Sequence, residues 1–292
     1  ERPNTLAVIG AGASGVEVAS AFGRMGTQVT LIEALPQILP AEEPEIAESL
    51  AKELAKQNVT VLTGTQVERA QEGAGAVQLT INGQPQAFEQ VVVAAGRAPD
   101  VSRLNLAAYG VAADERGTLQ VGPDQRTSHQ QIFAIGDVAP GPALAHKASE
   151  EAVIAIETIA GWTGVHGLEH NNIPRVTFCS PQVASIGLTQ AQAQAVGHDV
   201  RVGSFPLAAA GAATVYGDRS GLVKIIGDSN SGQIVGAHAF GAKAGDLIAE
   251  LAVAKSAGIG YVQLGRIIHA HPTISEAVME AARAAEGWAI HA

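Results

Sequence analysis

The segment at 269–276, HAHPTISE, holds the side chains best suited to moving a proton. His271 stands five residues before Glu276, and an imidazole beside a carboxylate is a base that works near neutral pH. The pattern therefore predicts that His271 accepts a proton and that Glu276 orients its ring. A structural interpretation stays open, because Thr273 and Glu276 have the spacing of a helix capping box, and a histidine before Pro272 often has a purely structural role.

A glycine-rich stretch at 8–19, VIGAGASGVEVA, has the pattern GxGxxG between an apolar run and a helix-compatible segment. Gly10 would permit a tight turn, Gly12 would let the backbone approach a pyrophosphate, and Gly15 would let helix and strand pack closely. Glu33 ends the next apolar run, where its carboxylate can accept both ribose hydroxyls and would repel a 2′-phosphate. The stretch predicts an NAD(H) site rather than an NADP(H) site. The alternative is a glycine turn that binds no ligand.

A third stretch, TSHQQIFAIGDVAPGPALAHKASEEA at 127–152, places an acidic residue after an apolar run. Gly136 and Asp137 follow the expected strand 132–135, and ligands of open α/β sheets bind at the carboxyl ends of strands. A helix at about 143–161 would turn its first N–H groups toward an anionic ring edge. These features predict contact with a polyol or nucleotide. The alternative is a turn aspartate satisfied by its own backbone.

The first part of the chain must supply the strands that position these residues. Apolar runs at 5–9 and 29–32, with a helix-compatible segment at 15–26 between them, predict a βαβ unit with parallel strands. After this βαβ unit the sequence predicts a charged helix at 44–57 and a strand at 59–62. A period-two insertion follows at 65–90, with turn signals at Gly73–Gly75 and Asn82-Gly83. The run Val91–Val93 is then expected to be a fully buried strand. Pro44 begins the charged helix, with Glu42, Glu43 and Glu45 near the positive end of its dipole.

The segment 173–292 is expected to form a separate α+β domain. Its apolar and period-two runs predict strands near 175–179, 183–187, 200–205, 221–227 and 233–239. Its helix-compatible segments lie near 243–257, 261–268 and 274–286. The fold class predicted for the whole chain is α/β.

Composition excludes several kinds of protein. The 292 residues suffice for about two domains, and the net charge of −10 argues against nucleic acid as a partner, because phosphate binding needs clustered Lys and Arg. The single cysteine, Cys179, excludes an intrachain disulfide and a cysteine-based zinc or iron–sulfur centre, so no metal site is predicted. No apolar run approaches the ~18 residues needed to span a membrane, and the start does not resemble a signal peptide. A cytoplasmic location is expected.

Five stretches resemble the pyridine nucleotide–disulfide oxidoreductases, and most closely the dihydrolipoamide dehydrogenase branch of that family. They are VIGAGASGVEVA at 8–19, VVVAAGRAPD at 91–100, the stretch at 127–152, VTFCSPQVASIGLT at 176–189 and HAHPTISEAVMEAA at 269–282. The closing GWAIHA at 287–292 is similar as well. The resemblance implies a Rossmann-like NAD-binding domain at 1–101, the C-terminal part of an FAD-binding domain at 102–169, and an α+β dimerisation domain at 170–292.

The resemblance implies NAD and FAD as cofactors and assigns residues to each. The NAD site would comprise Gly10, Ala11, Gly12, Ala13, Ser14, Gly15, Glu33, Val67, Ala94, Ala95, Gly96 and Arg97, with Glu17 near the contact between nicotinamide and flavin. Asp137, beside Gly136, would hold the ribityl chain of FAD, and Leu144, Ala145 and His146 would surround the isoalloxazine carbonyl with backbone N–H groups. His271 would be the acid–base catalyst and Glu276 the residue that holds its ring, in a site completed across a dimer interface. His269 is not assigned to catalysis.

The resemblance also implies a redox centre that this sequence lacks. Dihydrolipoamide would give a thiol proton to His271 and attack an enzyme disulfide, which the family carries as CxxxxC in a lobe N-terminal to the NAD domain, together with an earlier GxGxxG. Cys179 is expected to be a small buried residue instead. The segment 208–217 also lacks an arginine that the resemblance leads us to expect there.

Two classes of function follow. The first is the carboxyl portion of a dihydrolipoamide dehydrogenase of 2-oxo acid dehydrogenase complexes, in which electrons pass through a disulfide and FAD to NAD⁺. The second is a truncated, non-catalytic chain that binds NAD and dimerises. A sibling such as a mercuric or glutathione reductase is disfavoured by GPALAHKASEEA at 141–152 and by Glu33. The expected partners are dihydrolipoamide, a second copy of the chain and a dihydrolipoyl acyltransferase, whose basic domain could dock on the acidic surface; neither nucleic acid nor membrane is expected.

Overall fold

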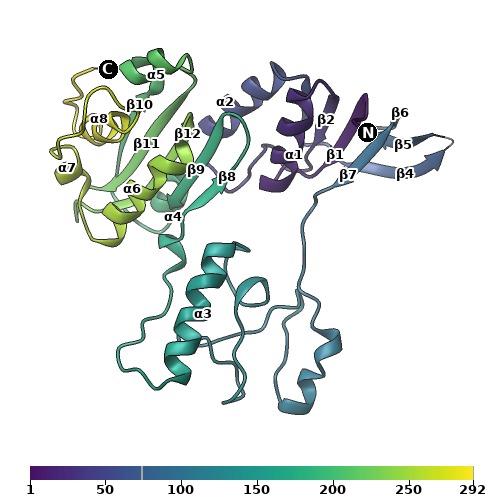
Figure 1. Ribbon diagram of the computed structural model, residues 1–292, viewed down its shortest axis with the longest axis horizontal. Helices are drawn as coiled ribbons and strands as arrows, with labels where there is room; N and C mark the ends of the chain where they lie inside the picture. Colours follow the sequence, from purple (N-terminus) through teal and green to yellow (C-terminus); the bar gives the residue numbers. More distant parts are fainter. Residues whose placement is uncertain (74, 292) are drawn as a thin grey trace. The chain divides into compact units, whose positions relative to one another are not determined.

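The computed structural model describes residues 1–73 and 75–291 (Figure 1). Contacts divide the chain into two compact units, one made of Glu1–Gly96 with Pro174–Ala292 and the other of Arg97–Ile173. Among the described residues, no helix combines the length and apolar character that crossing a membrane requires.

A four-stranded parallel sheet forms the first part of the larger unit. Its order is β3-β2-β1-β7, with β1 at Thr5–Ile9, β2 at Gln28–Ile32, β3 at Val59–Leu62 and β7 at Gln90–Val93. Helix α1 (Ala13–Arg24) connects β1 to β2, and helix α2 (Pro44–Ala55) connects β2 to β3. The apolar faces of both helices share one buried core with these strands. The predicted βαβ unit is confirmed, because apolar runs of this length are stable as parallel strands only when helices cover them.

The strand β7 is not fully buried, so that part of the prediction was wrong. It pairs with β1 alone and lies at the edge of the sheet, where Val93 is 72% exposed. An apolar run indicates a strand, but it does not tell whether both neighbours of that strand are present.

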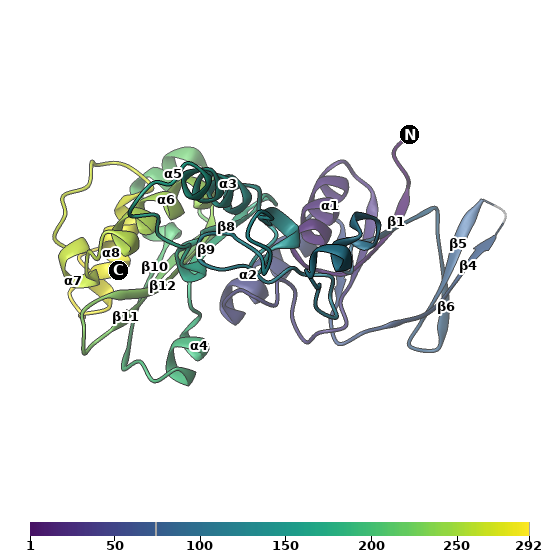
Figure 2. The same ribbon diagram turned by 90° about the horizontal axis from the view of Figure 1, so that it is seen from below.

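The period-two segment forms a separate antiparallel sheet, whose strands lie side by side in Figure 2. Its strands are β4 (Val67–Gly73), β5 (Ala76–Ile81) and β6 (Gln84–Phe88). Asn82 and Gly83 both have positive φ and join β5 to β6, as a two-residue hairpin requires. The predicted insertion is confirmed; the Gly73–Gly75 turn includes Ala74, which lies outside the described residues.

A five-stranded antiparallel sheet with helices forms the rest of this unit. The strand order is β10-β11-β12-β9-β8, with β8 at Arg175–Thr177, β9 at Gln182–Gly187, β10 at Val200–Pro206, β11 at Gly221–Asp228 and β12 at Ile234–Gly241. The helices are α4 (Gln190–Ala195), α5 (Gly211–Tyr216), α6 (Ala244–Ser256), α7 (Tyr261–Leu264) and α8 (Glu276–Ala284). The predicted α+β arrangement is confirmed, although α4 and α5 were not expected.

The smaller unit contains one long helix, α3 (Ala145–Ile159), and short 3-10 turns at Ser102–Leu104, Leu106–Tyr109, Gly136–Val138 and His170–Asn172. The strand predicted at 132–135 does not form. Within the described part of this unit, the segment makes an isolated bridge between Arg126 and Phe133, flanked by backbone hydrogen bonds from Thr127 to Ile132 and from Ala134 to Gln125. This pairing is too short to count as a regular strand.

Candidate functional site

The glycine turn between β1 and α1 has the geometry of a dinucleotide cradle. Gly10 has φ +99°, and a Cβ there would lie 2.5 Å from the Ala94 carbonyl oxygen. A Cβ on Gly15 would lie 1.8 Å from the Gly10 carbonyl oxygen, so only glycine lets α1 pack this closely. A Cβ on Gly12 would meet no described atom within 4 Å. The turn is therefore closely packed at Gly10 and Gly15, and open at Gly12, at the N-terminus of α1.

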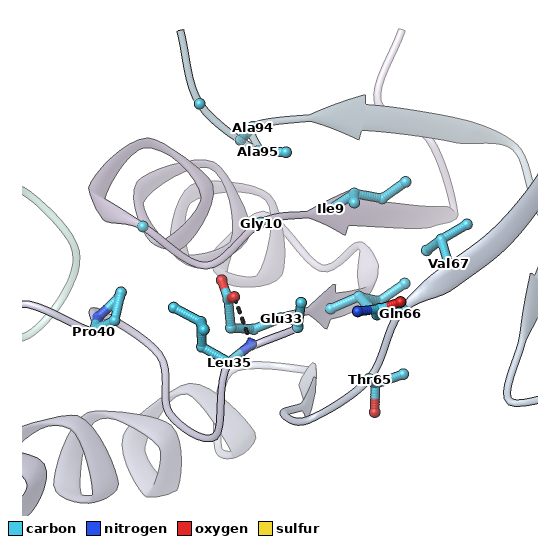
Figure 3. Close-up of a pocket in the computed structure, with 14 residues that line it drawn as sticks. Ile9, Gly10, Glu33, Leu35, Pro40, Thr65, Gln66, Val67, Ala94 and Ala95 are labelled. Carbon is cyan, nitrogen blue, oxygen red and sulfur yellow. Dashed lines mark hydrogen bonds between the residues drawn. The ribbon is translucent and has the colours of Figure 1, made fainter. Parts of the chain in front are cut away.

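Glu33 is fixed at the carboxyl end of β2. Its Oε2 accepts a hydrogen bond from the Ala11 N–H at 2.7 Å. Its Oε1 accepts one from the Leu35 N–H at 2.9 Å, which Figure 3 shows as a dashed line. The side chain is largely buried. A carboxylate has about four lone-pair positions, so both oxygens can still accept a hydroxyl. The backbone holds the carboxylate in place before any ligand arrives.

These residues line one cavity of about 490 Å³ at the carboxyl ends of β1, β2 and β7. The volume lies within the usual range of small-molecule sites. Of the predicted NAD-site residues, the cavity brings together Gly10, Gly12, Glu33, Val67, Ala94, Ala95 and Gly96. Its other lining residues were not predicted: Ile9, Ile32, Ala34, Leu35, Pro40, Thr65 and Gln66. Most of them flank a strand end, which is the signal that could have identified them.

The remaining residues predicted for the dinucleotide lie outside this lining. Ala11 is buried and bonds Glu33, whereas Ala13 and Ser14 are exposed in the first turn of α1. Glu17 accepts a hydrogen bond from the Phe178 N–H at 2.8 Å, which joins α1 to the segment between β8 and β9. Arg97 belongs to the smaller unit.

The residues predicted to contact flavin all belong to the smaller unit. Asp137 lies in the turn before α3, half exposed, with its Oδ2 3.7 Å from Arg97 Nη2. Leu144 precedes α3, and Ala145 and His146 are its first residues, with no side-chain hydrogen bond capping that end. The first N–H groups of an α-helix have no partner within the helix, so this end of α3 is where an acceptor could bind. The sequence pattern singled out neither Lys147 nor Glu151, although both contact Gly136.

The pair His271 and Glu276 is formed as predicted. Nδ1 of His271 lies 2.9 Å from Glu276 Oε1, with the imidazole 73% exposed and the carboxylate 14% exposed. Glu276 Oε2 also accepts a hydrogen bond from the Thr273 N–H at 2.8 Å. With Nδ1–H held by the carboxylate, Nε2 is the ring nitrogen that can accept a proton.

Glu276 stays ionised in this arrangement. Partial burial alone would raise the pKa of its carboxyl, but the Thr273 N–H and the ring of His271 outweigh that effect and lower it. The capping-box interpretation is half correct: Glu276 reaches back to the Thr273 N–H, whereas the Thr273 hydroxyl donates to the Ala270 carbonyl at 2.7 Å and does not cap the helix.

A second histidine–glutamate pair supports the same loop. His269 Nε2 lies 2.6 Å from Glu250 Oε1 on α6, and His269 Nδ1 lies 3.0 Å from the Ile267 carbonyl oxygen. Both partners only accept hydrogen bonds, so the ring donates from both nitrogens and is charged. The hydrogen bond to Glu250 raises the pKa of His269, although burial opposes it.

This pair gives a pH-dependent contribution to stability. Because the folded-state pKa of His269 is raised, the contribution is complete below the unfolded value of about 6.5 and is lost as pH rises through the folded value. Glu250→Gln is expected to destabilise the fold at pH 6 by about 1–3 kcal/mol, the usual cost of losing a charge-assisted hydrogen bond. Thermal unfolding between pH 5 and 9 measures it. The difference in stability between wild type and Glu250→Gln should shrink toward pH 9. A difference that stays constant with pH would contradict a charged His269–Glu250 pair.

Cys179 is buried, as predicted. Its Sγ contacts the Pro181 carbonyl oxygen at 3.0 Å, and burial raises its pKa to about 12. A thiol of this kind is neither a nucleophile nor a redox centre at neutral pH.

Comparisons with known proteins agree with the site geometry. Residues 1–152 match the model of the family described as pyridine nucleotide-disulphide oxidoreductase, and residues 173–282 match the dimerisation domain of the same family. The chain is 41% identical to the dihydrolipoyl dehydrogenase of Thermus scotoductus, over 99% of this chain and 63% of that protein. It is 40% identical to the dihydrolipoyl dehydrogenase of Geobacillus stearothermophilus, over 100% of this chain and 62% of that protein.

Solved structures show the same fold. The HOCl-induced flavoprotein disulfide reductase RclA of Escherichia coli, solved as a Cu(II) complex, superposes with a TM-score of 0.90 at 30% identity, over 97% of this chain and 64% of that one. LpdA of Mycobacterium tuberculosis superposes with a TM-score of 0.90 at 26% identity, over 97% of this chain and 62% of that one. The chain thus spans roughly three fifths of the length of these relatives. It belongs to the pyridine nucleotide-disulphide oxidoreductase family.

Proposed function

We propose that the chain is the NAD-binding and dimerising part of a dihydrolipoamide dehydrogenase, which oxidises dihydrolipoamide and reduces NAD⁺. The observation that carries this proposal is the pair His271 and Glu276, in which a partly buried carboxylate fixes an exposed imidazole. In the proposed reaction Nε2 of His271 takes the proton of a substrate thiol, and the thiolate so formed attacks a disulfide. That disulfide must come from residues outside this sequence, because Cys179 is its only cysteine.

NAD⁺ fits the cavity at the carboxyl ends of β1, β2 and β7. The open space at Gly12 suits a pyrophosphate at the N-terminus of α1, where unpaired N–H groups and the helix dipole favour an anion. The carboxylate of Glu33 would accept the ribose hydroxyls and disfavour a 2′-phosphate. The cavity also explains why Val67 and Ala94–Gly96 belong to the proposed site: they close it from the side of β4 and β7.

FAD is the second proposed cofactor, and when bound it supplies the two-electron transfer between the thiols and NAD⁺. The exposed Asp137 carboxylate would accept hydrogen bonds from ribityl hydroxyls. The N-terminus of α3, at Ala145, would face the flavin carbonyl, where the helix dipole favours an acceptor. The Asp137 carboxylate and the N-terminus of α3 are thus the groups of this chain that fit FAD.

The proposed function is tested on the protein in the form in which its organism makes it, with any residues that precede Glu1. A flavin absorbance band and NAD⁺ reduction that depends on dihydrolipoamide are expected, with NADP⁺ a poor substitute. A protein that binds flavin but reduces NAD⁺ with no lipoamide-dependent rate would overturn the proposal in favour of a sibling reductase.

The runner-up function is a non-catalytic chain that binds NAD and dimerises. The buried Cys179, with its pKa of about 12, favours it, because this sequence holds no dithiol of its own. A colourless dimer that binds NAD⁺ and carries no flavin in its native form would support it.

The acidic surface suggests the macromolecular partner. With 28 Asp and Glu against 18 Lys and Arg, we propose docking on a basic domain of a dihydrolipoyl acyltransferase. Exchanging exposed acidic residues until the net charge is zero is expected to abolish that complex. Unchanged binding would contradict the electrostatic part of the proposal.

The glycine turn offers a matched pair of variants for the NAD site. Gly12→Ala is expected to weaken NAD⁺ binding about tenfold or more, some 1.4 kcal/mol, because its methyl group would occupy the open space proposed for the pyrophosphate. The fold should tolerate it, since that Cβ meets no described atom within 4 Å. Gly15→Ala, whose Cβ would lie 1.8 Å from a carbonyl oxygen, should lower thermal stability instead. Titration calorimetry and thermal unfolding of both variants separate the two effects, and equal NAD⁺ affinity of Gly12→Ala and wild type would argue against the proposed site.

A further inference from the structure

A buried ion pair in the smaller unit binds the backbone of one residue from both sides. Lys147 and Glu151 are 0% and 2% exposed, and their charged atoms lie 2.8 Å apart. Lys147 Nζ donates a hydrogen bond to the Gly136 carbonyl oxygen at 3.0 Å. The Gly136 N–H donates one to Glu151 Oε2 at 2.7 Å. Both polar backbone groups of Gly136 are thus held by side chains of α3.

Helix stability does not account for this pair. A lysine that precedes a glutamate by four residues is the less favourable order on a helix, and a cation in the first turn opposes the helix dipole. Removing two charges from water is also costly, so a buried ion pair seldom stabilises a fold more than apolar residues of the same size. The pair therefore needs another explanation, and its contacts with Gly136 offer one.

Gly136 is where the backbone needs such support. The segment before it forms no regular strand among the described residues, and its backbone hydrogen bonds with residues 125–127 end at Ala134, two residues before Gly136. Gly136 has φ +73°, a conformation that side-chain-bearing residues rarely adopt. The next residue is Asp137, whose side chain is half exposed and lies 3.7 Å from Arg97 Nη2. Whatever fixes the Gly136 peptide also fixes the position of the Asp137 carboxylate.

We propose that Lys147 and Glu151 are positioning residues, which hold the Gly136 peptide so that the Asp137 carboxylate is preorganised for the polyol chain of a flavin. The inference rests on the proposed function for the identity of the ligand. The hold on Gly136 itself is independent of any ligand.

The deciding variant replaces the pair by apolar residues of similar volume, Lys147→Met with Glu151→Met, in the protein as its organism makes it. Thermal stability should stay close to that of wild type. The dissociation constant for FAD, measured by flavin fluorescence on the deflavinated protein, should rise at least tenfold. Hydrogen exchange at the Gly136 amide, measured without flavin, should accelerate. The matched control is Glu48→Met with Lys52→Met, an exposed pair with the same four-residue spacing. It should change neither the dissociation constant for FAD nor the hydrogen exchange at the Gly136 amide.

A rescue variant separates positioning from packing. Lys147→Met with Glu151→Gln keeps an acceptor for the Gly136 N–H, so it should bind FAD more tightly than the double methionine variant at similar stability. It also serves as the deciding variant if the double methionine protein does not fold, and its FAD affinity should then fall below that of wild type because the carbonyl contact is lost.

The outcomes distinguish the inference from the proposed function. Variants that fold and bind FAD as wild type does would overturn the inference and leave the proposed function standing. A wild-type protein with no affinity for FAD would overturn the flavin part of both. In that case hydrogen exchange at the Gly136 amide still tests the rest of the inference. An exchange rate in the double methionine variant equal to that of wild type would contradict the proposed hold on Gly136.

Discussion

Replacement of His271 by glutamine is expected to lower kcat for dihydrolipoamide oxidation by about 100- to 10,000-fold, the usual contribution of a positioned general base. Glutamine can still bond Glu276 but has no nitrogen that accepts a proton. KM should change little, because the ring is 73% exposed and its packing is slight. Steady-state kinetics with dihydrolipoamide and NAD⁺ measure the effect.

The control reaction omits the thiol. Reduction of an artificial electron acceptor by NADH needs the nucleotide and the flavin but no thiolate, so His271→Gln should leave it near the wild-type rate. If both reactions fall equally, His271 supports the structure and not the proton transfer. If neither falls, the base lies elsewhere and the proposed function loses the observation that carries it.

Glu276→Gln tests the carboxylate separately. The amide oxygen can keep the bond from the Thr273 N–H, so the loop should persist. The charge that stabilises the imidazolium is lost, so kcat should fall and the dependence of kcat on pH should change. A shifted pH profile is the sign of an orienting carboxylate, because a residue that serves only the loop would leave the profile in place.

The sequence was most informative where function depends on a local pattern. Gly10, Gly12 and Gly15 were each assigned a physical role from spacing alone. The Cβ distances agree with the tight turn at Gly10 and the close helix packing at Gly15, and the pyrophosphate contact of Gly12 stays a prediction. The position of Glu33 followed from the length of the apolar run before it. His271 and Glu276 lie close enough in sequence for a five-residue loop to bring them together.

The errors arose where structure depends on distant partners. The run at 132–135 is as apolar as β1, yet it forms no regular strand because its pairing with residues 125–127 is limited to one isolated bridge. Val93 is exposed for a related reason, since β7 has only one paired neighbour. Helix α4 could have been found from the capping box of Thr189 and Gln192. The short α5 contains Gly211 and β-branched residues and gave no periodic signal.

The acidic residues before α2 illustrate the same limit and lead to a large expected effect. Their position suggested an interaction with the helix dipole, but Glu42 is 7% exposed and reaches the five-stranded sheet instead. Glu42 Oε1 accepts a hydrogen bond from Ser185 Oγ at 2.9 Å and lies 3.4 Å from Arg175 Nε. Its Oε2 lies 3.5 Å from Nδ1 of the fully buried His238. These partners lie more than 130 residues away in sequence, beyond the reach of any local pattern.

The environment keeps Glu42 ionised. Burial alone would raise the pKa of its carboxyl, but His238, Arg175 and the Ser185 hydroxyl outweigh burial and lower it. His238 Nε2 lies 3.1 Å from the Leu188 carbonyl oxygen, to which it can only donate. The Glu42 carboxylate thus contacts Ser185, Arg175 and His238, and it joins the parallel-sheet part of the larger unit to its five-stranded sheet.

Glu42→Gln is accordingly expected to destabilise the larger unit by about 1–3 kcal/mol at pH 7, because the half-buried Arg175 and the Ser185 hydroxyl lose a charged partner. Denaturant unfolding measures the loss, and Glu48→Gln on the exposed face of α2 is the matched control that should leave stability unchanged. Because the pKa of Glu42 is lowered in the fold, its contribution is present above the unfolded value of about 4.3 and is lost as pH falls through the folded value. The stability difference between wild type and variant should therefore narrow in acid. If Glu42→Gln lowers the free energy of unfolding by less than about 1 kcal/mol at pH 7, Glu42 contributes no more than an ordinary surface ion pair. It would then have no important role in joining the two sheets.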